Sequence, residues 1–477
     1  MQKKLKRQNL QPNNKKISFI PTVHLHCGYI LYYTIYKIYK RKDVFCMEYI
    51  KCDVAIIGGG ASGLMSAVAL AKANKNLKIV IIEHNNKTGK KLLATGNGRC
   101  NLTNKNMYPN AYYGTVQPYM EKILNKYNAD YICNYFQEIG LMTYSDDQGR
   151  VYPISNNVAS VLDVLRNYII SKGVQELCDT TVTDIKKSKN SYVLHCNNDT
   201  QIVAKNVILS CGGKASPKLS TDGAGYSLAQ KLNIKTNNLL PSLVPVTCDN
   251  KFLSSLKGIR VKGDVALFAD NKIIEKQSGE IQFTANALSG ICVFQLSRLV
   301  NEFFTSKTVM DKPVNKIELV VDILPQYTLE ECRSIIYNRI NSLKSYNIEN
   351  FFDGFLHKRV SSAILKECKI TDISRKVATL NKKEISSLAT TLKHWVFTPS
   401  KISSFENAQV TAGGVLANEI NLKSMESKKH SNLYIIGELL DIDGICGGYN
   451  LHWAWVSGII CSENIINKLR VKNDKTK

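Results

Sequence analysis

Three glycines and one glutamate are spaced as in a site for a dinucleotide. Gly58, Gly60 and Gly63 form the pattern GxGxxG, and Glu83 follows twenty residues after Gly63. In such a pattern the first glycine allows a tight turn, the second lets the backbone approach a pyrophosphate, and the third lets a helix pack closely on a strand. A carboxylate at this distance accepts hydrogen bonds from an adenosine ribose and disfavours a 2'-phosphate. The spacing therefore predicts a site for phosphate and ribose groups.

The segments around these glycines supply the elements that must position them. Residues 52–57 predict a buried parallel strand, 64–73 a helix rich in Ala and Leu, and 79–82 a second strand. Ala61 and Ser62 precede the helix, whose free N–H groups would face the phosphates. A strand, a glycine turn, a helix and an acid in this order favour a dinucleotide site over a glycine-rich turn without a ligand.

A second loop, residues 90–103, alternates Asn, Gly and Arg in a way that an ordinary surface loop does not need. At this loop the sequence resembles the BaiN/YhiN-like family of FAD-dependent oxidoreductases, also called aminoacetone-oxidase-type flavoproteins. The resemblance covers residues 50–465, and its motifs are long and ordered. Three further blocks carry it, at 210–217 with 223–226, at 279–297 and at 410–458.

The resemblance implies an α/β fold in which a Rossmann-like FAD-binding domain is interrupted by an inserted β subdomain and a helical subdomain. The residue pattern agrees, because short β-type runs fill 242–321 whereas Leu and Ile recur at helical spacing over 328–392. We therefore expect a discontinuous FAD-binding domain at 47–240 and 400–477, a β-rich inserted domain at 241–327 and 393–399, and a helical subdomain at 328–392.

The closing block supplies the far end of the expected cofactor site. The resemblance places Gly437 and Glu438 beside the pyrophosphate and ribityl groups, and the turn at Asn450 and Leu451 beside the N1–C2=O edge of the isoalloxazine. A helix N-terminus there stabilises the negative charge of a reduced flavin by about 1 kcal/mol. The expected FAD-binding residues are Gly58, Gly60, Ala61, Ser62, Gly63, Glu83, Lys91, Gly98, Arg99, Asn101, Val182, Cys211, Gly212, Gly437, Glu438, Asp441, Gly448, Asn450 and Leu451.

Three side chains of the same block are candidates for proton transfer. Cys446 or Tyr449 could donate a proton to a reduced carbon, and His452 could titrate near neutrality. Each also has a structural interpretation, since such a cysteine is often a small buried residue and a histidine beside two tryptophans is often packed and hydrogen-bonded. The family usually has His or Asp after Thr284, but this chain has Ala285 there, which removes the side chain expected to transfer a proton.

The predicted function is that of an FAD-dependent oxidoreductase that reduces an activated C=C bond, or oxidises a small amine, by hydride transfer through the flavin. The sequence has no second strand–GxGxxG–helix unit, so NAD(P)H, the expected reductant, would bind transiently over the flavin face. The alternatives are a reductase of uracil in ribosomal RNA, which the resemblance includes, and an FAD-bound RNA-binding protein without turnover. Hydrolase and metalloprotease motifs are absent from the sequence, and no metal site is predicted.

The formal net charge of +24 points to a polyanionic partner such as ribosomal RNA. Residues 1–46 hold ten Lys and Arg against Asp43, so +9 of this charge lies in that extension. Lys outnumbers Arg by 51 to 12, and Lys lacks the fork geometry favoured for phosphates. A small-molecule substrate and ribosomal RNA both stay open as partners. The basic residues to test in the helical part are Lys358, Arg359, Lys366, Lys369, Arg375, Lys376, Lys382 and Lys383.

The segment 1–46 differs in composition from the rest of the chain. Its strongly apolar part, 28–36, is short for a membrane span of about 20 residues, so no stable membrane association is expected. We expect a disordered basic extension, or an upstream start codon that is not used, with Met47 close to the first strand. Fourteen scattered cysteines without a Cys-x-x-Cys pair favour reduced thiols and a cytoplasmic protein. No pattern indicates an oligomeric state.

Overall fold

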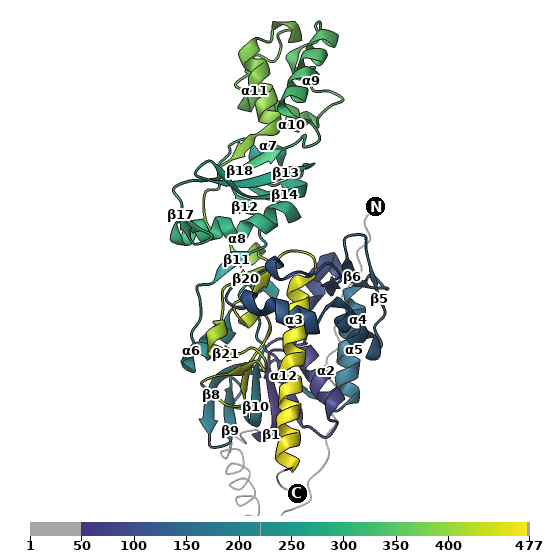
Figure 1. Cartoon of the computed structure of the whole chain (residues 1–477), viewed down its shortest axis with the longest axis vertical. Coiled ribbons are helices and arrows are strands. Elements are labelled where there is room, and N and C mark those ends of the chain that lie inside the picture. The colour runs from purple at the N-terminus through teal and green to yellow at the C-terminus, as the bar shows by residue number, and fades with distance from the viewer. Residues whose placement is uncertain (1–48, 220, 475–477) are drawn as a thin grey trace, which may run out of the picture. The chain divides into compact units, whose positions relative to one another are not determined.

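The computed structural model describes residues 49–219 and 221–474 (Figure 1), and the expected extension at 1–46 lies outside them. The contacts place the described residues in one unit. Most of its buried side chains belong to two hydrophobic cores, one that joins 52–234 with 415–466 and one within 246–397. Within the described part of the chain, no helix combines the length and the apolar character that a membrane crossing needs.

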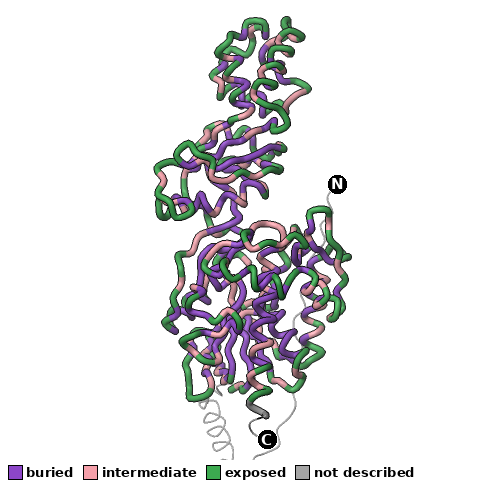
Figure 2. The backbone as a smooth tube through the Cα atoms, viewed as in Figure 1, coloured by how far each residue is buried: buried purple, intermediate pink, exposed green. Residues whose placement is uncertain are grey.

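The first core surrounds a mixed sheet whose centre is parallel. The strand order is β21-β22-β23-β10-β1-β2-β7, with β9 paired to β10 and β8 paired to β9. β1 (Tyr49–Ile57) pairs in parallel with both β10 (Gln201–Leu209) and β2 (Ile79–Ile82). The expected strands at 52–57 and 79–82 are thus confirmed, and Figure 2 shows the central strands as buried, as a parallel sheet requires.

Further helices and strands surround this sheet. The helices are α3 (Met120–Lys126), α4 (Ala129–Glu138), α5 (Val158–Ser171) and α6 (Ala224–Lys231). The strands are β3 (Thr103–Asn104), β4 (Tyr112–Tyr113), β5 (Thr143–Ser145), β6 (Arg150–Pro153), β7 (Gln175–Leu177), β8 (Val182–Ser188), β9 (Ser191–Cys196), β21 (Ile420–Asn421), β22 (Glu426–Ser427), β23 (Leu433–Ile435) and β24 (Asp443–Gly444).

Two helices of this part, α2 (Ala61–Ala73) and α12 (Tyr449–Asp474), pack closely against each other. A Cβ added to Gly458 of α12 would lie 2.7 Å from the carbonyl oxygen of Ser62 in α2, so the approach needs a glycine. The helix expected at 64–73 is confirmed as part of α2, and α12 supplies the helix whose N-terminus was expected at Asn450 and Leu451. Their packing holds the first turn of α2 and the first turn of α12 in one region of the molecule.

The second core lies in the stretch expected to be inserted. Its sheet has the order β12-β15-β14-β13-β18-β19, and all of its pairs are antiparallel. Helix α8 (Ile291–Ser306) packs against β14 (Lys272–Phe283). The remaining elements are β12 (Val246–Thr247), α7 (Leu253–Leu256), β13 (Arg260–Ala269), β15 (Ala287–Ser289), β16 (Thr308–Val309), β17 (Lys312–Pro313), β18 (Ile317–Asp322) and β19 (Trp395–Phe397).

Three helices complete the second core, namely α9 (Leu329–Ser342), α10 (Lys358–Glu367) and α11 (Lys382–Lys393). α9 and α11 each begin with a capping box, which satisfies two backbone N–H groups at the helix start. The buried side chains of these helices belong to the same hydrophobic cluster as those of the sheet. The strands and helices of this stretch therefore share one core, and the division into a β-rich domain and a helical subdomain stays a prediction.

The two connections between the cores run side by side. β11 (Leu240–Ser242) pairs antiparallel with β20 (Val410–Ala412). Helix α8 is attached to this pair, because the Nδ2 of Asn301 donates to the carbonyl oxygen of Pro241 at 2.8 Å. The second core is thus held through hydrogen-bonded strands rather than through two loose chains.

Candidate cofactor site and active site

A cavity of about 920 Å³ is lined by the carboxyl ends of β1, β2 and β10 and by segments of both cores. Its volume lies at the upper end of the range for small-molecule and cofactor sites. In open α/β sheets, ligands bind at this edge. The expected site residues that line the cavity are Gly58, Gly60, Ala61, Ser62, Glu83, Lys91, Arg99, Asn101, Val182, Cys211, Gly212, Glu438, Cys446, Gly448, Asn450 and Leu451.

Four expected cofactor residues do not line the cavity of the described chain, namely Gly63, Gly98, Gly437 and Asp441. Gly437 acts through packing, because a Cβ there would lie 2.5 Å from the Oγ of Ser62. Asp441 is fully buried, and its Oδ2 accepts the N–H of Thr115 at 3.2 Å. Gly437 therefore packs against a residue of the cavity wall, whereas Asp441 binds Thr115, which does not line the cavity.

The glycine turn between β1 and α2 has the geometry that phosphate binding needs. Gly58 adopts a φ of +103°, and a Cβ on Gly63 would lie 2.0 Å from the Gly58 carbonyl oxygen, so both positions require glycine. Gly60 differs, because a Cβ there meets no described atom within 4 Å. No side chain of the described residues caps the N-terminus of α2. Its N–H groups and the open space at Gly60 therefore suit a phosphate.

Glu83 follows β2 and braces the glycine turn. Its Oε2 accepts the N–H of Gly59 at 2.8 Å, and its Oε1 accepts the N–H of Asn85 at 2.9 Å. The side chain is buried in the protein and lines the cavity. Each carboxylate oxygen has more than one acceptor site, so Glu83 can also accept the hydroxyl groups of a ribose.

Lys91 and Glu438 form an ion pair on the cavity wall, with Nζ and Oε2 2.9 Å apart. The other carboxylate oxygen of Glu438 accepts the N–H of Thr411 at 2.8 Å. Glu438 is therefore occupied by the protein itself. The Lys91 ammonium has two further donors, and its charge suits the phosphates of a dinucleotide.

The loop 445–448 and the first turn of α12 build the other end of the cavity. The side chain of Asn450 closes this loop, because its Oδ1 accepts the Gly444 N–H and its Nδ2 donates to the Gly444 carbonyl oxygen, both at 2.8 Å. Gly448 adopts a φ of +101°, and a Cβ there would lie 2.6 Å from the carbonyl oxygen of Thr103. Bare backbone at this end can approach a flat ring.

Asn101 carries a buried polar atom that the described protein does not satisfy. Its Oδ1 has no hydrogen-bond partner among the described residues, and the residue lines the cavity. An unsatisfied buried acceptor costs about 1–3 kcal/mol, so a donor from a bound molecule is expected here. Together with the open space at Gly60 and the acceptor sites of Glu83, this fits an FAD molecule that extends from the glycine turn to the N-terminus of α12.

Arg99 stacks on an aromatic ring of the cavity. Its guanidinium lies 4.5 Å from the centre of the Tyr152 ring, and both residues line the cavity. A stacked guanidinium keeps its N–H donors available at the edge. Arg99 can therefore bind a carbonyl or anionic oxygen in the cavity, as expected from its place in the loop 90–103.

The second core contributes a wall that the sequence motifs did not predict. It includes Arg260, Glu280 and Gln282 on the β13–β14 hairpin, and Ile291 and Phe294 in the first turn of α8. Arg260 and Glu280 form an ion pair at 3.1 Å. The resemblance over 279–297 pointed to this segment, but a linear motif does not indicate which alternate side chains of a strand face a cavity.

Of the three candidates for proton transfer, Cys446 lines the cavity, whereas Tyr449 and His452 do not line it in the described chain. Burial raises the pKa of its thiol to about 12, so the thiol holds its proton at neutral pH. Cys211 lines the cavity as well, and burial raises its pKa to about 12. The Cys211 Sγ donates to the carbonyl oxygen of Ile57 at 3.4 Å, which places it at the end of β1.

Tyr449 and His452 lie inside the protein and do not line the described cavity. The Tyr449 hydroxyl donates to the Asn106 carbonyl oxygen at 3.0 Å. The Nε2 of His452 donates to the Tyr127 carbonyl oxygen at 2.9 Å, and its Nδ1 lies 2.8 Å from the Thr103 hydroxyl. Burial lowers the pKa of His452 to about 4. The expectation that His452 titrates near neutrality is therefore wrong, because its ring is excluded from water.

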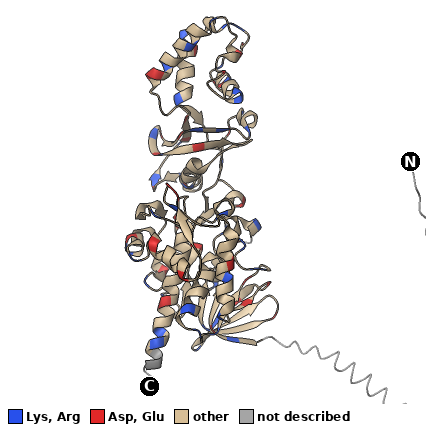
Figure 3. Cartoon of the chain, turned by 90° about the vertical axis from the view of Figure 1, so that its right-hand side faces the viewer, with Lys and Arg blue, Asp and Glu red and all other residues tan. Residues whose placement is uncertain are grey.

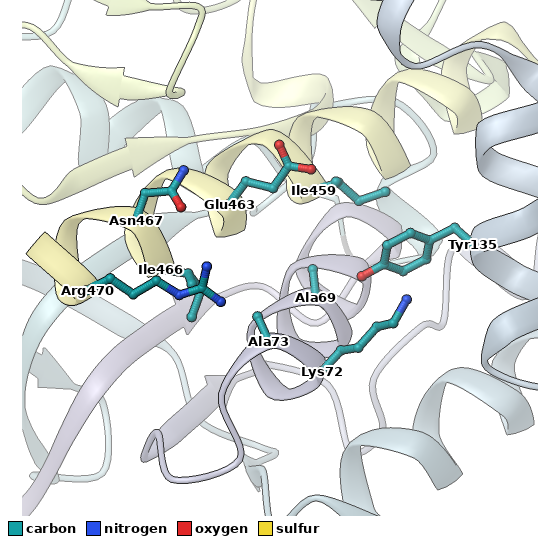
Figure 4. A pocket seen from close by; sticks show the side chains of 9 residues that line it. All are labelled: Ala69, Lys72, Ala73, Tyr135, Ile459, Glu463, Ile466, Asn467 and Arg470. Atoms are coloured by element: carbon teal, nitrogen blue, oxygen red, sulfur yellow. The ribbon is translucent and has the colours of Figure 1, made fainter.

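A smaller depression of about 430 Å³ lies between α2, α4 and α12 (Figure 4). The ammonium of Lys72 lies 4.4 Å from the centre of the Tyr135 ring, and Glu463 accepts the Tyr127 hydroxyl at 2.7 Å. Lys72 and Glu463, two of its polar side chains, therefore already have partners in the protein. None of its lining residues is a glycine, so bare backbone for a phosphate or a flat ring is lacking there.

The glycine turn, the acid after β2 and the site at the N-terminus of α12 define a dinucleotide-binding protein of the flavoprotein class. The family model described as the HI0933-like protein Rossmann domain matches residues 52–464. The chain belongs to this family and is an FAD-dependent oxidoreductase. The expected family and the Rossmann-like α/β fold class are therefore confirmed.

Individual relatives cover most of the chain. A 3-dehydro-bile acid delta(4,6)-reductase of Clostridium scindens is 33% identical over 407 residues, which are 85% of this chain and 97% of that protein. A ribosomal RNA dihydrouridine synthase of Haemophilus influenzae is 29% identical over 421 residues, 86% of this chain and 97% of that protein. Among solved structures, a quinol fumarate reductase of E. coli is 14% identical with a TM-score of 0.46, over 89% of this chain and 72% of its own. A structural similarity this low carries no argument about function.

We predict that alanine substitution weakens FAD binding at Gly60 and destabilises the fold at Gly63. Gly60→Ala should leave the free energy of unfolding within about 0.5 kcal/mol of wild type, because its Cβ meets no described protein atom. It should weaken FAD binding by about tenfold or more, roughly 1.4 kcal/mol, because the Cβ enters the space of the phosphates. Gly63→Ala should destabilise the fold by about 1–3 kcal/mol. Urea unfolding and FAD titration measure the two quantities, and unchanged FAD affinity in Gly60→Ala would contradict the assignment.

We predict that the burial of His452 makes the free energy of unfolding decrease as the pH falls. Its pKa is about 4 in the folded protein and returns to the ordinary 6.5 on unfolding. The unfolded state therefore binds the proton first as the pH falls, and stability decreases between about pH 6.5 and 4, by on the order of 3 kcal/mol. His452→Gln should flatten this part of the profile. Urea unfolding across this range measures the slope, and equal slopes in wild type and His452→Gln would refute the prediction.

Proposed function

We propose that this protein reduces an activated C=C bond of a small-molecule substrate, with NAD(P)H as a transient reductant. The observation that carries the proposal is the continuity of one cavity, whose lining runs from the turn at Gly58 and Gly60 through the loop 445–448 to the second-core wall at Ile291. A cofactor in the first part leaves the second part for a substrate. The relative from Clostridium scindens, which is named a delta(4,6)-reductase, supports this class of reaction.

The residues of this chain have separate tasks in such a reaction. FAD, when bound, supplies the hydride that adds to one carbon of the C=C bond. The N-terminus of α2 and the Lys91 ammonium hold the diphosphate, and Glu83 holds the ribose. The first turn of α12 stabilises the negative charge that develops on reduction. The wall with Arg260 and Gln282 binds polar groups of the substrate.

The second carbon of the C=C bond must take up a proton, so the site needs a donor. Cys446 has the position for this task, because it lines the cavity in the loop 445–448. Its thiol is protonated at neutral pH, since burial raises its pKa to about 12. A solvent proton restores the thiol after each turnover. Hydride and proton together complete the two-electron reduction of the bond.

The elements of the described residues support a reductant, which we infer to be NAD(P)H, that binds transiently and has no unit of its own. In the described residues the strand–glycine turn–helix unit at β1 and α2 serves the FAD. A reductant without a unit of its own reaches the flavin through the substrate part of the cavity and leaves before the substrate enters. We place the protein in the cytoplasm, where NAD(P)H is available. The twelve cysteines of the described residues are free thiols, which agrees with a reducing compartment.

Ribosomal RNA is the second candidate substrate. Relatives from Haemophilus influenzae and Escherichia coli are named ribosomal RNA dihydrouridine synthases. Two of the basic residues expected to meet RNA serve the fold instead, because Arg359 donates to the carbonyl oxygens of Ser255 and Lys257 and Arg375 pairs with Glu384. Lys376 is exposed, and its Nζ donates to the Oδ1 of Asn347 at 3.0 Å. Figure 3 shows Lys and Arg on the helices of the second core. Exposed lysines that remain for a polyanion are Lys358 and Lys366 on α10, Lys382 and Lys383 on α11, and Lys369 just after α10.

Anaerobic reduction of the purified yellow protein tests the proposed function and separates the two substrates. We expect NADH or NADPH to bleach the bound flavin, and a 3-oxo-4,6-diene bile acid to restore the oxidised spectrum faster than buffer does. If ribosomal RNA restores it instead, the second candidate is correct. Replacing the five exposed lysines by Gln should then lower the salt dependence of RNA binding, by about one unit of log–log slope for each phosphate that a lysine no longer neutralises. A protein that retains no FAD, or that no acceptor reoxidises, would refute both.

Cys446→Ala should slow substrate reduction and leave flavin reduction by NAD(P)H unchanged, because a proton is needed only in the second half-reaction. Loss of a general acid costs roughly 10²–10⁴-fold in rate. Cys446→Ser should retain part of the rate, since a hydroxyl group can donate. The control Cys133→Ala removes a half-buried thiol of α4 outside the cavity and should have no effect. Single-turnover stopped-flow kinetics measure both half-reactions, and a wild-type rate in Cys446→Ala would exclude this donor.

A further inference from the structure

A buried ion pair joins the second core to the loop at the flavin end of the cavity. The Nε of Arg298 in α8 donates to the Oδ1 of Asp443 at 3.2 Å, and the Asp443 side chain is 1% exposed. The Oδ2 of Asp443 accepts the hydroxyl of Ser242 at 3.0 Å. Because Ser242 belongs to β11 and Asp443 to β24, the ion pair lies where β11, α8 and β24 meet.

A tyrosine ring holds the guanidinium in one orientation. Arg298 lies over the ring of Tyr113 at 4.9 Å from its centre, and Tyr113 is the partner of Asp443 in the β4–β24 ladder. Glu302, one turn further along α8, lies 3.8 Å from the Arg298 Nη1. A planar guanidinium that is bonded to a carboxylate and stacked on a ring has fewer orientations than an ammonium would have. Arg298 is thus fixed by groups of both cores.

Each partner of the ion pair continues along the chain into the cavity wall. α8 begins at Ile291, seven residues before Arg298, and Ile291 lines the cavity. This is a distance of roughly 10 Å along a helix. β24 continues directly into Ile445 and Cys446, which line the cavity as well. The ion pair therefore connects the second-core wall to the loop at the flavin end.

Other hydrogen bonds hold α8 without reaching β24. The Ser297 hydroxyl accepts the N–H of Val244 at 3.2 Å, and the Asn301 Nδ2 donates to the carbonyl oxygen of Pro241 at 2.8 Å. Both attach the middle of α8 to the connecting segment at β11. A buried ion pair adds little net stability over apolar residues of the same volume. What the ion pair adds at this junction is a fixed geometry between α8 and β24.

We propose that Arg298 is a positioning residue that, through Asp443, sets the first turn of α8 relative to the loop 445–448. The arrangement determines how a substrate fits against the flavin. The inference rests on the proposed function, in which the substrate lies between these two segments. Arg298 does not line the cavity of the described chain, so it transfers neither hydride nor proton. Its loss weakens substrate binding and leaves the chemical step largely unchanged.

Amide hydrogen exchange tests this coupling without FAD or substrate. Arg298→Met and Asp443→Asn should each raise exchange in both 291–296 and 445–450, by roughly tenfold or more. Arg298→Lys keeps the charge and should restore part of the protection. The matched control is Lys307→Met, which removes a cation from the other end of α8, away from β24, and should change neither segment.

A double variant separates positioning from stability. Arg298→Met with Asp443→Leu removes both charges of the buried pair and leaves no unpaired charge at position 443, so its resistance to urea should exceed that of Arg298→Met alone. Exchange in both segments should nevertheless stay raised, because the fixed geometry is lost. A folded variant with raised exchange in one segment alone, or in neither, would overturn the proposal.

Steady-state kinetics with a 3-oxo-4,6-diene bile acid as the probe give the functional readout. Arg298→Met should raise KM by roughly tenfold and leave kcat within about threefold, with an altered visible circular dichroism of the bound FAD. Arg298→Lys should have a KM between those of the wild type and Arg298→Met. A fall in kcat at constant KM would refute the positioning role. If the wild type binds no FAD or reduces no probe, the proposed function fails, whereas the exchange experiment still decides the coupling.

Discussion

The close approach of backbone to backbone at two glycines is the constraint on which this structure depends. A Cβ on Gly63 would lie 2.0 Å from the Gly58 carbonyl oxygen, and a Cβ on Gly458 would lie 2.7 Å from that of Ser62. Because Gly63 and Gly458 lack a Cβ, α2 can pack closely on β1, and α12 can pack closely on α2. The first turns of both helices consequently line one cavity. Since a helix N-terminus offers free N–H groups and partial positive charge, the same packing creates a place for phosphates and a place for a reduced flavin.

The two cores contribute different chemistry to this cavity. The first core supplies bare backbone, the acid Glu83 and the buried acceptor of Asn101, all of which suit a cofactor that stays bound. The second core supplies the Arg260–Glu280 pair and the side chain of Ile291, which is 54% exposed in the wall. This wall offers hydrogen bonds and apolar contact together. The wall therefore suits a substrate, which enters and leaves, whereas the first core suits a cofactor, which stays bound.

Local sequence patterns predicted the cofactor half of the site, because the strand, turn and helix at 52–73 and Glu83 need only near neighbours to be recognised. His452 marks the limit of such patterns. Its ring is buried beside groups distant in sequence, such as Thr103, which is 349 residues away, so the residue type alone suggested a titrating group where the structure has a neutral one. Arg260 was missed for a related reason. It reaches the cavity through the placement of a whole hairpin, and hydrophobic periodicity does not encode that placement.

Two ion pairs, one within the second core and one that joins the two cores, show how burial decides what an ion pair can do. The side chains of Arg260 and Glu280 are 59% and 52% exposed, so water and salt screen their attraction and either side chain can turn toward a substrate at little cost. The side chains of Arg298 and Asp443 are 20% and 1% exposed, and separating them would leave a charge inside the protein. The exposed Arg260–Glu280 pair can therefore rearrange when a substrate contacts the second-core wall. The buried Arg298–Asp443 pair holds that wall in position. A second core that is attached through paired strands and a buried ion pair can thus shape a site whose cofactor is bound by the first core.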